Sequence, residues 1–185
     1  MRPTDTLKAE HRVIERVLAV LNQASDKLAR NEPIDPTVFT QSVDFIRTFA
    51  DRCHHIKEED SLYRRMGERG FPTDSGPIAV MLAEHEEGRR YVRGLADAAE
   101  RYGRGETAAA DDIVHNARGY ADLLAQHIQK EDNIMYEIAD SRLGPEDQRD
   151  LEQLFERLEQ ETIGPGGHER YVALVAKLEQ AVQRA

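Results

Sequence analysis

Apolar residues recur every three or four positions along most of the chain, in long stretches separated by short clusters of Gly and Pro. This spacing is typical of amphipathic helices, and each Gly or Pro cluster ends one helix and lets the next begin. At one such break, Asp35 is a good helix N-cap and Pro36 suits the first helical turn, where its missing N–H costs nothing. The pattern predicts helices over residues 5–30, 36–68, 77–102, 107–142 and 145–162, and a final helical segment after 164–167.

These elements predict an all-α protein. Ala, Leu, Glu and Arg favour helix and are abundant, whereas β-branched and aromatic residues are sparse. Short loops join the first four helices, which favours antiparallel neighbours and an up-down-up-down four-helix bundle with an additional C-terminal helical segment. We expect a single domain over 1–185, made of the bundle over 5–142 and a helical extension over 145–185, because no Ser- or Pro-rich linker divides the chain.

Charge and composition narrow the classes of partner. The formal net charge of −10 repels a phosphate backbone, so we expect no nucleic-acid partner. No stretch approaches the ~20 apolar residues that cross a bilayer, and the first residues lack the apolar core of a signal peptide, so we expect a cytoplasmic protein without a membrane partner. Cys53 is the single cysteine. One cysteine cannot form a disulfide framework or a cage of thiolate ligands, so any metal ion must be held by His and carboxylate side chains.

The apolar seams of the predicted helices are interrupted by His and Glu. In the second helix, the pair His55 and Glu59 is followed at helical spacing by Leu62 and Met66, which mark a buried face. The seam of the fourth helix continues beyond its His and Glu through Ile134 and Ile138. The candidate ligands on these seams are His11, His55, Glu59, His85, His127 and Glu131.

The candidate ligands are of types and spacings that suit a metal site. A buried carboxylate costs several kcal/mol unless a cation compensates it, and neither Glu59 nor Glu131 has a Lys or Arg neighbour on its seam. Each follows a histidine by four residues, which puts imidazole and carboxylate on one helix face. At ~1.5 Å per residue, the ligands lie about 9–17 Å from one end of an antiparallel bundle, so they can converge. Four imidazoles and two carboxylates exceed one tetrahedral zinc and predict two irons bridged by the carboxylates.

The register of the second helix has an alternative, because His54 and Glu58 also form an i,i+4 pair. This second pair continues through Ser61 and Arg65, which is typical of a solvated face. We therefore prefer the pair that begins at His55.

Other residues with suitable chemistry are placed outside the site. His115 lies among aspartates on a polar face. His168 begins the apolar stripe of the last helix, where packing or capping is favoured over a replacement ligand. Tyr63, Tyr120 and Tyr136 are near enough in sequence to donate a hydrogen bond at the metal, or are ordinary core residues.

The order of these groups, His, HxxxE, His and HxxxE over four helices, resembles the hemerythrin-like (HHE cation-binding) family. The resemblance covers roughly residues 5–142 and rests on the stretches CHHIKEED at 53–60, AEHE at 83–86 and QHIQKED at 126–132. It implies a non-haem di-iron centre, with an oxo or hydroxo bridge, that meets oxygen, nitric oxide or peroxide. Carried over residue by residue, it implies metal ligands at His11, His55, Glu59, His85, His127 and Glu131.

One position departs from the oxygen-carrying branch of that family. Arg89 stands four residues after His85, where that branch has a second histidine. A missing imidazole leaves a coordination position for water or substrate, as catalytic metal centres do.

The resemblance therefore implies a protein that binds or reacts with these small molecules in sensing, scavenging or redox defence. One alternative is a di-iron enzyme that reduces nitric oxide or peroxide, or supports iron–sulfur repair, with a separate electron donor. A second alternative is a ferritin-like oxidase, which would use Glu-x-x-His pairs on two helices; only Asp51-x-x-His54 and Asp112-x-x-His115 come near that spacing. A third is a metal-free helical interaction protein.

Overall fold

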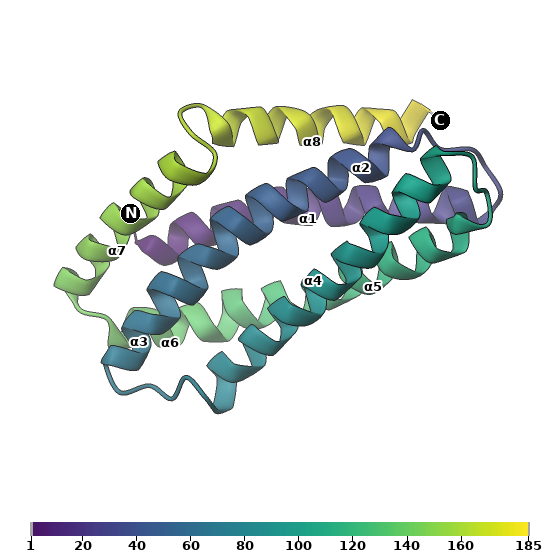
Figure 1. Ribbon diagram of the computed structural model, residues 1–185. Coiled ribbons are helices and arrows are strands. Elements are labelled where there is room, and N and C mark those ends of the chain that lie inside the picture. The colour runs from purple at the N-terminus through teal and green to yellow at the C-terminus, as the bar shows by residue number, and fades with distance from the viewer. Residues whose placement is uncertain (1, 185) are drawn as a thin grey trace.

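The computed structural model describes residues 2–184, which are helical apart from short connections (Figure 1). The segment predicted as one helix over 36–68 is continuous and is made of α2, η1, η2 and α3; that over 107–142 is made of α5, η3 and α6. The predicted helix ends are confirmed to within a residue or two. The elements are α1 (Pro3–Ala29), α2 (Thr37–Phe45), η1 (Ile46–His55), η2 (Lys57–Tyr63), α3 (Arg64–Glu68), α4 (Gly76–Gly103), α5 (Ala109–Lys130), η3 (Glu131–Met135), α6 (Tyr136–Arg142), α7 (Pro145–Thr162) and α8 (Gly167–Arg184).

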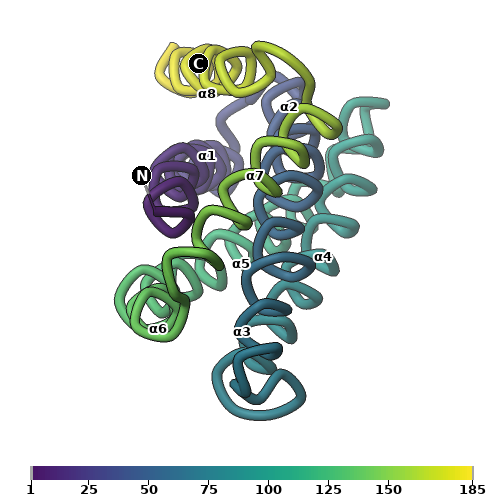
Figure 2. Tube along the Cα trace, turned by 90° about the vertical axis from the view of Figure 1, so that its left-hand side faces the viewer, coloured from purple at the N-terminus to yellow at the C-terminus, as the bar shows by residue number. Residues whose placement is uncertain are grey.

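The long helices pack side by side into a bundle. α5 lies against both α1 and α4, and α2 lies against α4 (Figure 1). α8 runs along the outside of α1 and α2, and α7 contacts η1, η2 and α1 (Figure 2). The all-helical class is therefore confirmed. None of the helices within residues 2–184 is both long and apolar enough to cross a bilayer.

The helix ends have local causes in the sequence. The carboxylate of Asp35 accepts a hydrogen bond from the backbone N–H of Thr37 at 2.9 Å, so Asp35 caps the start of α2 as predicted. Gly70 and Gly105 follow α3 and α4 with φ of 84° and 93°, a left-handed conformation that favours glycine.

The core consists of two apolar clusters with a polar layer between them. The larger cluster includes Leu21, Phe45 and Leu95 and fills the end of the bundle near the α1–α2 and α4–α5 connections. The smaller cluster includes Leu62 and Met135 and fills the opposite end. The buried His and Glu side chains lie along each helix between the residues of these two clusters. The polar layer is thus shielded from water by apolar side chains on both sides.

Three segments next to this layer, η1, η2 and η3, are π-helical, with backbone N–H groups bonded to carbonyls five residues earlier. A π-helical turn holds more residues than the 3.6 of an α-helix, so it changes which side chains face the core. In η3, Met135 is 1% exposed whereas Ile134 is 53% exposed. The predicted continuation of the fourth seam through Ile134 is therefore wrong.

Candidate metal centre

The polar layer contains two compact groups of potential metal ligands. Within each group, one ligand atom from every residue lies within 4.8 Å of the others, and every member is buried. Glu58 belongs to both groups, so the two groups are adjacent. The first consists of His55, Glu58, His85 and His127, and the second consists of His11, His54, Glu58 and Glu131.

The structure brings together five of the six candidate residues and leaves out Glu59. In the second helix, the side chains of both His54 and His55 are buried, and Glu58 is 0% exposed. Ser61, taken as a mark of the wet face, is buried as well. The expectation that the His54 and Glu58 face is solvated is wrong, because the wider π-helical turns of η1 and η2 direct both adjacent histidines inward.

Glu59 lies just outside the ligand groups and supports one of their members. Its carboxylate is 2.7 Å from Nδ1 of His85 and accepts a hydrogen bond of 2.7 Å from Arg89. Burial raises the pKa of Glu59, but the hydrogen bonds from His85 and Arg89 outweigh it and the net shift is downward. An ionised Glu59 therefore accepts the Nδ1–H of His85 and leaves Nε2 to face the site.

Each of the other four histidines has the same arrangement. A carboxylate lies next to Nδ1 in every case, so the ring is oriented with Nε2 toward the centre of the bundle. The Nδ1 distances are 2.8 Å for His11 to Asp132, 2.8 Å for His54 to Glu10, 3.4 Å for His55 to Asp51, and 2.8 Å for His127 to Glu84.

A cationic side chain in turn holds each of these carboxylates. Arg12 pairs with Asp132, Lys130 pairs with Glu84, and Lys57 pairs with Glu10. Arg89 binds both Asp51, at 2.8 Å, and Glu59. Supporting interactions of this kind fix the orientation of metal ligands and make them better donors.

The hydrogen bonds that the cations and the imidazole rings donate keep most of these supporting carboxylates ionised. Burial raises the pKa of Asp51, but hydrogen bonds from His55 and Arg89 bring it down to about 2. The hydrogen bond from His127 lowers the pKa of Glu84.

Glu10 differs because it is almost fully buried, and loss of hydration raises its pKa despite the pairing with Lys57. Lys57 is 0% exposed and also donates a hydrogen bond of 3.1 Å to Glu159. A chain of polar contacts, buried as far as Lys57, therefore connects His54 to the partly exposed Glu159 of α7.

The inner atoms of the two groups lack the partners that buried polar atoms need. Nε2 of His54 and Oε2 of Glu58 have no hydrogen-bond partner among the described residues. Oε2 of Glu131 lies 3.2 Å from Nε2 of His11 and 3.2 Å from Nε2 of His127, which can pair with it only when the rings are protonated there. Nε2 of His85 and Nε2 of His127 face each other at 2.9 Å. With both rings neutral and protonated at Nδ1, these two nitrogens present lone pairs to one another, an arrangement that suits a shared cation.

Without a metal ion, the buried carboxylates of Glu58 and Glu131 repel each other and favour the uptake of positive charge. Burial and the nearby carboxylate of Glu131 raise the pKa of Glu58 well above its usual range. Burial lowers the pKa of His127, but the charge and hydrogen bond of Glu131 prevail and raise it to about 9. The protein alone thus relieves the repulsion by taking up protons, and a metal cation supplies the same charge without them.

Two buried phenols complete the inner layer. Tyr136 donates a hydrogen bond of 2.5 Å to Glu58, and its hydroxyl is 3.3 Å from Nε2 of His11. Tyr63 donates a hydrogen bond to Glu131. Both tyrosines therefore donate hydrogen bonds to carboxylates of the candidate ligand groups.

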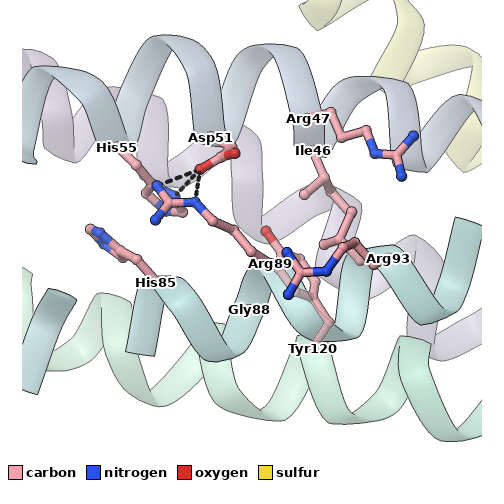
Figure 3. A pocket seen from close by; sticks show the side chains of 10 residues that line it. Ile46, Arg47, Asp51, His55, His85, Gly88, Arg89, Arg93 and Tyr120 are labelled. Atoms are coloured by element: carbon pink, nitrogen blue, oxygen red, sulfur yellow. Dashed lines mark hydrogen bonds and ion pairs between the residues drawn. The ribbon is translucent and has the colours of Figure 1, made fainter. Parts of the chain in front are cut away.

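Arg89 does not mark a missing imidazole. Its guanidinium donates hydrogen bonds to Asp51, Glu59 and Glu86. Figure 3 shows it next to Asp51 and His55. The two groups together contain five histidines, one of which is His54 of the second predicted helix. The expectation of an additional open position at Arg89 is therefore not supported.

Three other residues noted in the sequence belong to neither ligand group. His115 is exposed and packs edge-on near Tyr91, and His168 packs against Phe49 with ring centroids 5.5 Å apart. Cys53 is buried, and burial raises the pKa of its thiol to about 12. The exposed position of His115 and the packing of His168 agree with the predictions.

The bundle and its buried His and Glu groups define a cation-binding helical domain. The chain belongs to the family described as Hemerythrin HHE cation binding domain, whose model matches residues 2–139. It is also similar to "Uncharacterized protein Rv1995" of Mycobacterium tuberculosis and "Uncharacterized protein Mb2018" of Mycobacterium bovis. Each is 22% identical over 97% of this chain and 69% of the mycobacterial protein. No solved structure matches the chain.

Proposed function

We propose that this protein holds two non-haem iron ions, one in each ligand group, and binds or reacts with oxygen, nitric oxide or peroxide. The observation that carries the proposal is the shared carboxylate of Glu58 between two buried groups, in which inner atoms such as Nε2 of His54 and Oε2 of Glu58 have no hydrogen-bond partner among the described residues. The proposed frame is an up-down-up-down four-helix bundle over 5–142, to which residues 145–185 add a helical extension. The expected role is sensing, scavenging or redox defence.

The donor set supports two ions of large coordination number. Five imidazoles and two carboxylates exceed what one tetrahedral zinc takes, and mixed nitrogen and oxygen donors suit iron. We propose His11, His54, His55, Glu58, His85, His127 and Glu131 as the ligands. An oxo or hydroxo bridge would supply the remaining shared donor.

The chain itself excludes water and fixes protons around this centre. Every ligand is at most 4% exposed, and apolar clusters cover the layer on both sides. Burial raises the pKa values of Tyr63 and Tyr136 well above the usual range, so both phenols keep their protons as hydrogen-bond donors. Iron in such a site supplies the redox chemistry that gases and peroxide require, and the dry surroundings protect it from side reactions.

The test is to load the protein with ferrous iron without oxygen, remove excess metal, and measure iron per chain. Optical spectra before and after oxygen and nitric oxide then show whether the iron is accessible. We expect close to two irons per chain and a spectral change with at least one gas. One zinc per chain, or no metal after reconstitution, would overturn the proposal.

A cavity next to His55 and His85 favours a second candidate function, reduction of nitric oxide or peroxide by the same centre. This cavity would hold a small substrate beside two of the proposed ligand rings. Because Cys53 is the single cysteine, the chain has no cysteine pair to deliver electrons, and a separate donor is required. Sustained consumption of nitric oxide or peroxide with a chemical reductant would support the enzyme; a single turnover per iron pair would support binding alone.

A further inference from the structure

The cavity beside the metal ligands has chemistry that the metal centre does not use. It has a volume of about 160 Å³ and lies between η1, α4 and α5 (Figure 3). His55 and His85 line one part of it, and their rings stack with centroids 3.9 Å apart. Arg47 and Arg93 also line it and are exposed, so they mark the side open to solvent.

Arg47 and Arg93 are cations without a counter-ion. Neither has an ion pair or hydrogen bond to any residue within 2–184, although the chain as a whole carries a net charge of −10. Arg89 differs, because its guanidinium is already bound by Asp51, Glu59 and Glu86. The cavity therefore keeps two guanidinium groups available for an anion.

A buried hydroxyl adds an independent observation. Tyr120 lines the cavity, its side chain is 1% exposed, and its hydroxyl has no hydrogen-bond partner among the described residues. Burial raises the pKa of Tyr120, so the hydroxyl remains a donor. A buried donor without a partner is costly, and an acceptor bound in the cavity would satisfy it.

The rest of the lining consists of the ion pair between Asp51 and Arg89, whose charges offset each other, and of an apolar part. Ile46 and Val92 are 2% and 4% exposed, and the backbone of Gly88 leaves space beside them. A cavity of about this volume holds roughly six non-hydrogen atoms, as an engineered cavity of about 150 Å³ holds benzene. An inorganic ion would leave these apolar walls without a partner.

We propose that this cavity binds a small organic monocarboxylate of about four carbons. The carboxylate accepts hydrogen bonds from Arg47, Arg93 and Tyr120, and the hydrocarbon chain lies against Ile46 and Val92. Guanidinium groups are the side chains best suited to a planar carboxylate. The inference rests on the proposed function only for the nature of the neighbouring centre, since none of these five residues is a proposed metal ligand.

Calorimetric titration of the iron-loaded protein with acetate, propionate and butyrate tests the ligand class. Affinity should rise about fourfold for each added methylene, the gain expected from burying that group. Hexanoate should bind no better than butyrate, because the cavity is then full. Nitrite tests the head group alone and should bind no better than acetate. Equal affinity for the three carboxylates, or nitrite binding tighter than butyrate, would overturn the proposal.

Variants test the residues. Arg47→Gln and Arg93→Gln should each weaken butyrate binding about tenfold, and Tyr120→Phe about fivefold, which are typical losses for charged and neutral hydrogen bonds. Arg90→Gln is the matched control, because Arg90 is an exposed arginine of α4 that does not line the cavity. Unchanged affinity in the Arg47→Gln/Arg93→Gln double variant would contradict the assignment.

Iron content, measured on every sample, separates this inference from the proposed function. Iron-loaded protein that does not bind butyrate at about 10 mM, a concentration that detects even weak affinity, would refute the carboxylate site and leave the metal proposal standing. Protein that takes up no iron but binds butyrate with the expected dependence on chain length would refute the metal proposal alone.

Discussion

Replacing Glu58 by Gln should remove most of the iron from the protein, whereas replacing its neighbour Glu59 by Gln should leave most of it bound. Both changes keep the side-chain shape and remove one negative charge. The two residues differ in what they reach. Oε2 of Glu58 is 3.7 Å from Nε2 of His54 and 3.5 Å from Nε2 of His85, so it serves both ligand groups. Glu59 reaches only Nδ1 of His85, from outside.

The magnitudes follow from these positions. Glu58→Gln removes a charged contact to each of two ions; at about 1.5–3 kcal/mol per contact, the combined loss is about 3–6 kcal/mol, or roughly 10²–10⁴-fold in iron affinity. Glu59→Gln removes a supporting hydrogen bond to one ligand, which typically costs about 10–100-fold. The Glu58 variant should therefore lose iron to a chelator that the Glu59 variant still resists.

The assay is anaerobic loading with ferrous iron, followed by titration with a coloured chelator and metal analysis of the desalted protein. Far-ultraviolet circular dichroism shows whether each variant is folded. His54→Gln and His115→Gln form a second matched pair, one within a ligand group and one on the surface. If the Glu59 variant loses iron while the Glu58 variant keeps two ions, the assignment of the second helix is refuted.

Three further predictions concern stability. The hydrogen bonds from two arginines lower the pKa of Asp147, so Asp147→Asn should lower the free energy of unfolding by about 1 kcal/mol at pH 7. This difference should begin to decrease as the pH falls below about 4, where the carboxylate of the unfolded chain becomes protonated, and should vanish only at the lower pH at which the native carboxylate is protonated too. Urea titrations at several pH values measure it. Lys57→Met leaves the buried carboxylate of Glu10 without its partner and should lower the free energy of unfolding by about 3–5 kcal/mol. Adding Glu10→Gln should restore a large part of this loss, and a double variant as unstable as the single one would contradict the prediction. Met135→Ala removes a buried side chain and should lower the free energy of unfolding by about 2–4 kcal/mol, whereas Ile134→Ala, at an exposed position, should lower it by less than about 0.5 kcal/mol. Thermal unfolding measures both, and the opposite order would contradict the π-helical register of η3.

The helices could be predicted because their signals are local. The spacing of apolar residues, the cap at Asp35 and the Gly and Pro breaks act over a few positions and reappear in the structure. His11, His85, His127 and Glu131 also follow from this reasoning, since each interrupts an apolar seam of an α-helical stretch.

The second helix could not be resolved in the same way. A period of 3.6 residues forces a choice between His54 and His55, whereas the π-helical turns bury both and place Glu58 inward. The adjacent pairs His54-His55 and Glu58-Glu59 were the one sign in the sequence that both registers could be buried, since each register contains an i,i+4 pair of His and Glu.

The supporting carboxylates were also beyond local reasoning. Glu84 holds His127 from a neighbouring helix, and Asp132 holds His11 across 121 positions of sequence. Such pairs depend on how the helices pack, which the pattern along one helix does not encode.

The contact from α7 to His54, through Glu159, Lys57 and Glu10, changes where the metal-binding unit ends. The family match stops at residue 139, and a chain cut there would lose both Glu159 and the ring of Phe155, which lies 5.9 Å from the ammonium of Lys57. The ammonium would then meet water, and the carboxylate that orients His54 would be held less firmly. The smallest fragment that keeps both ligand groups rigid therefore extends through α7, to residue 162.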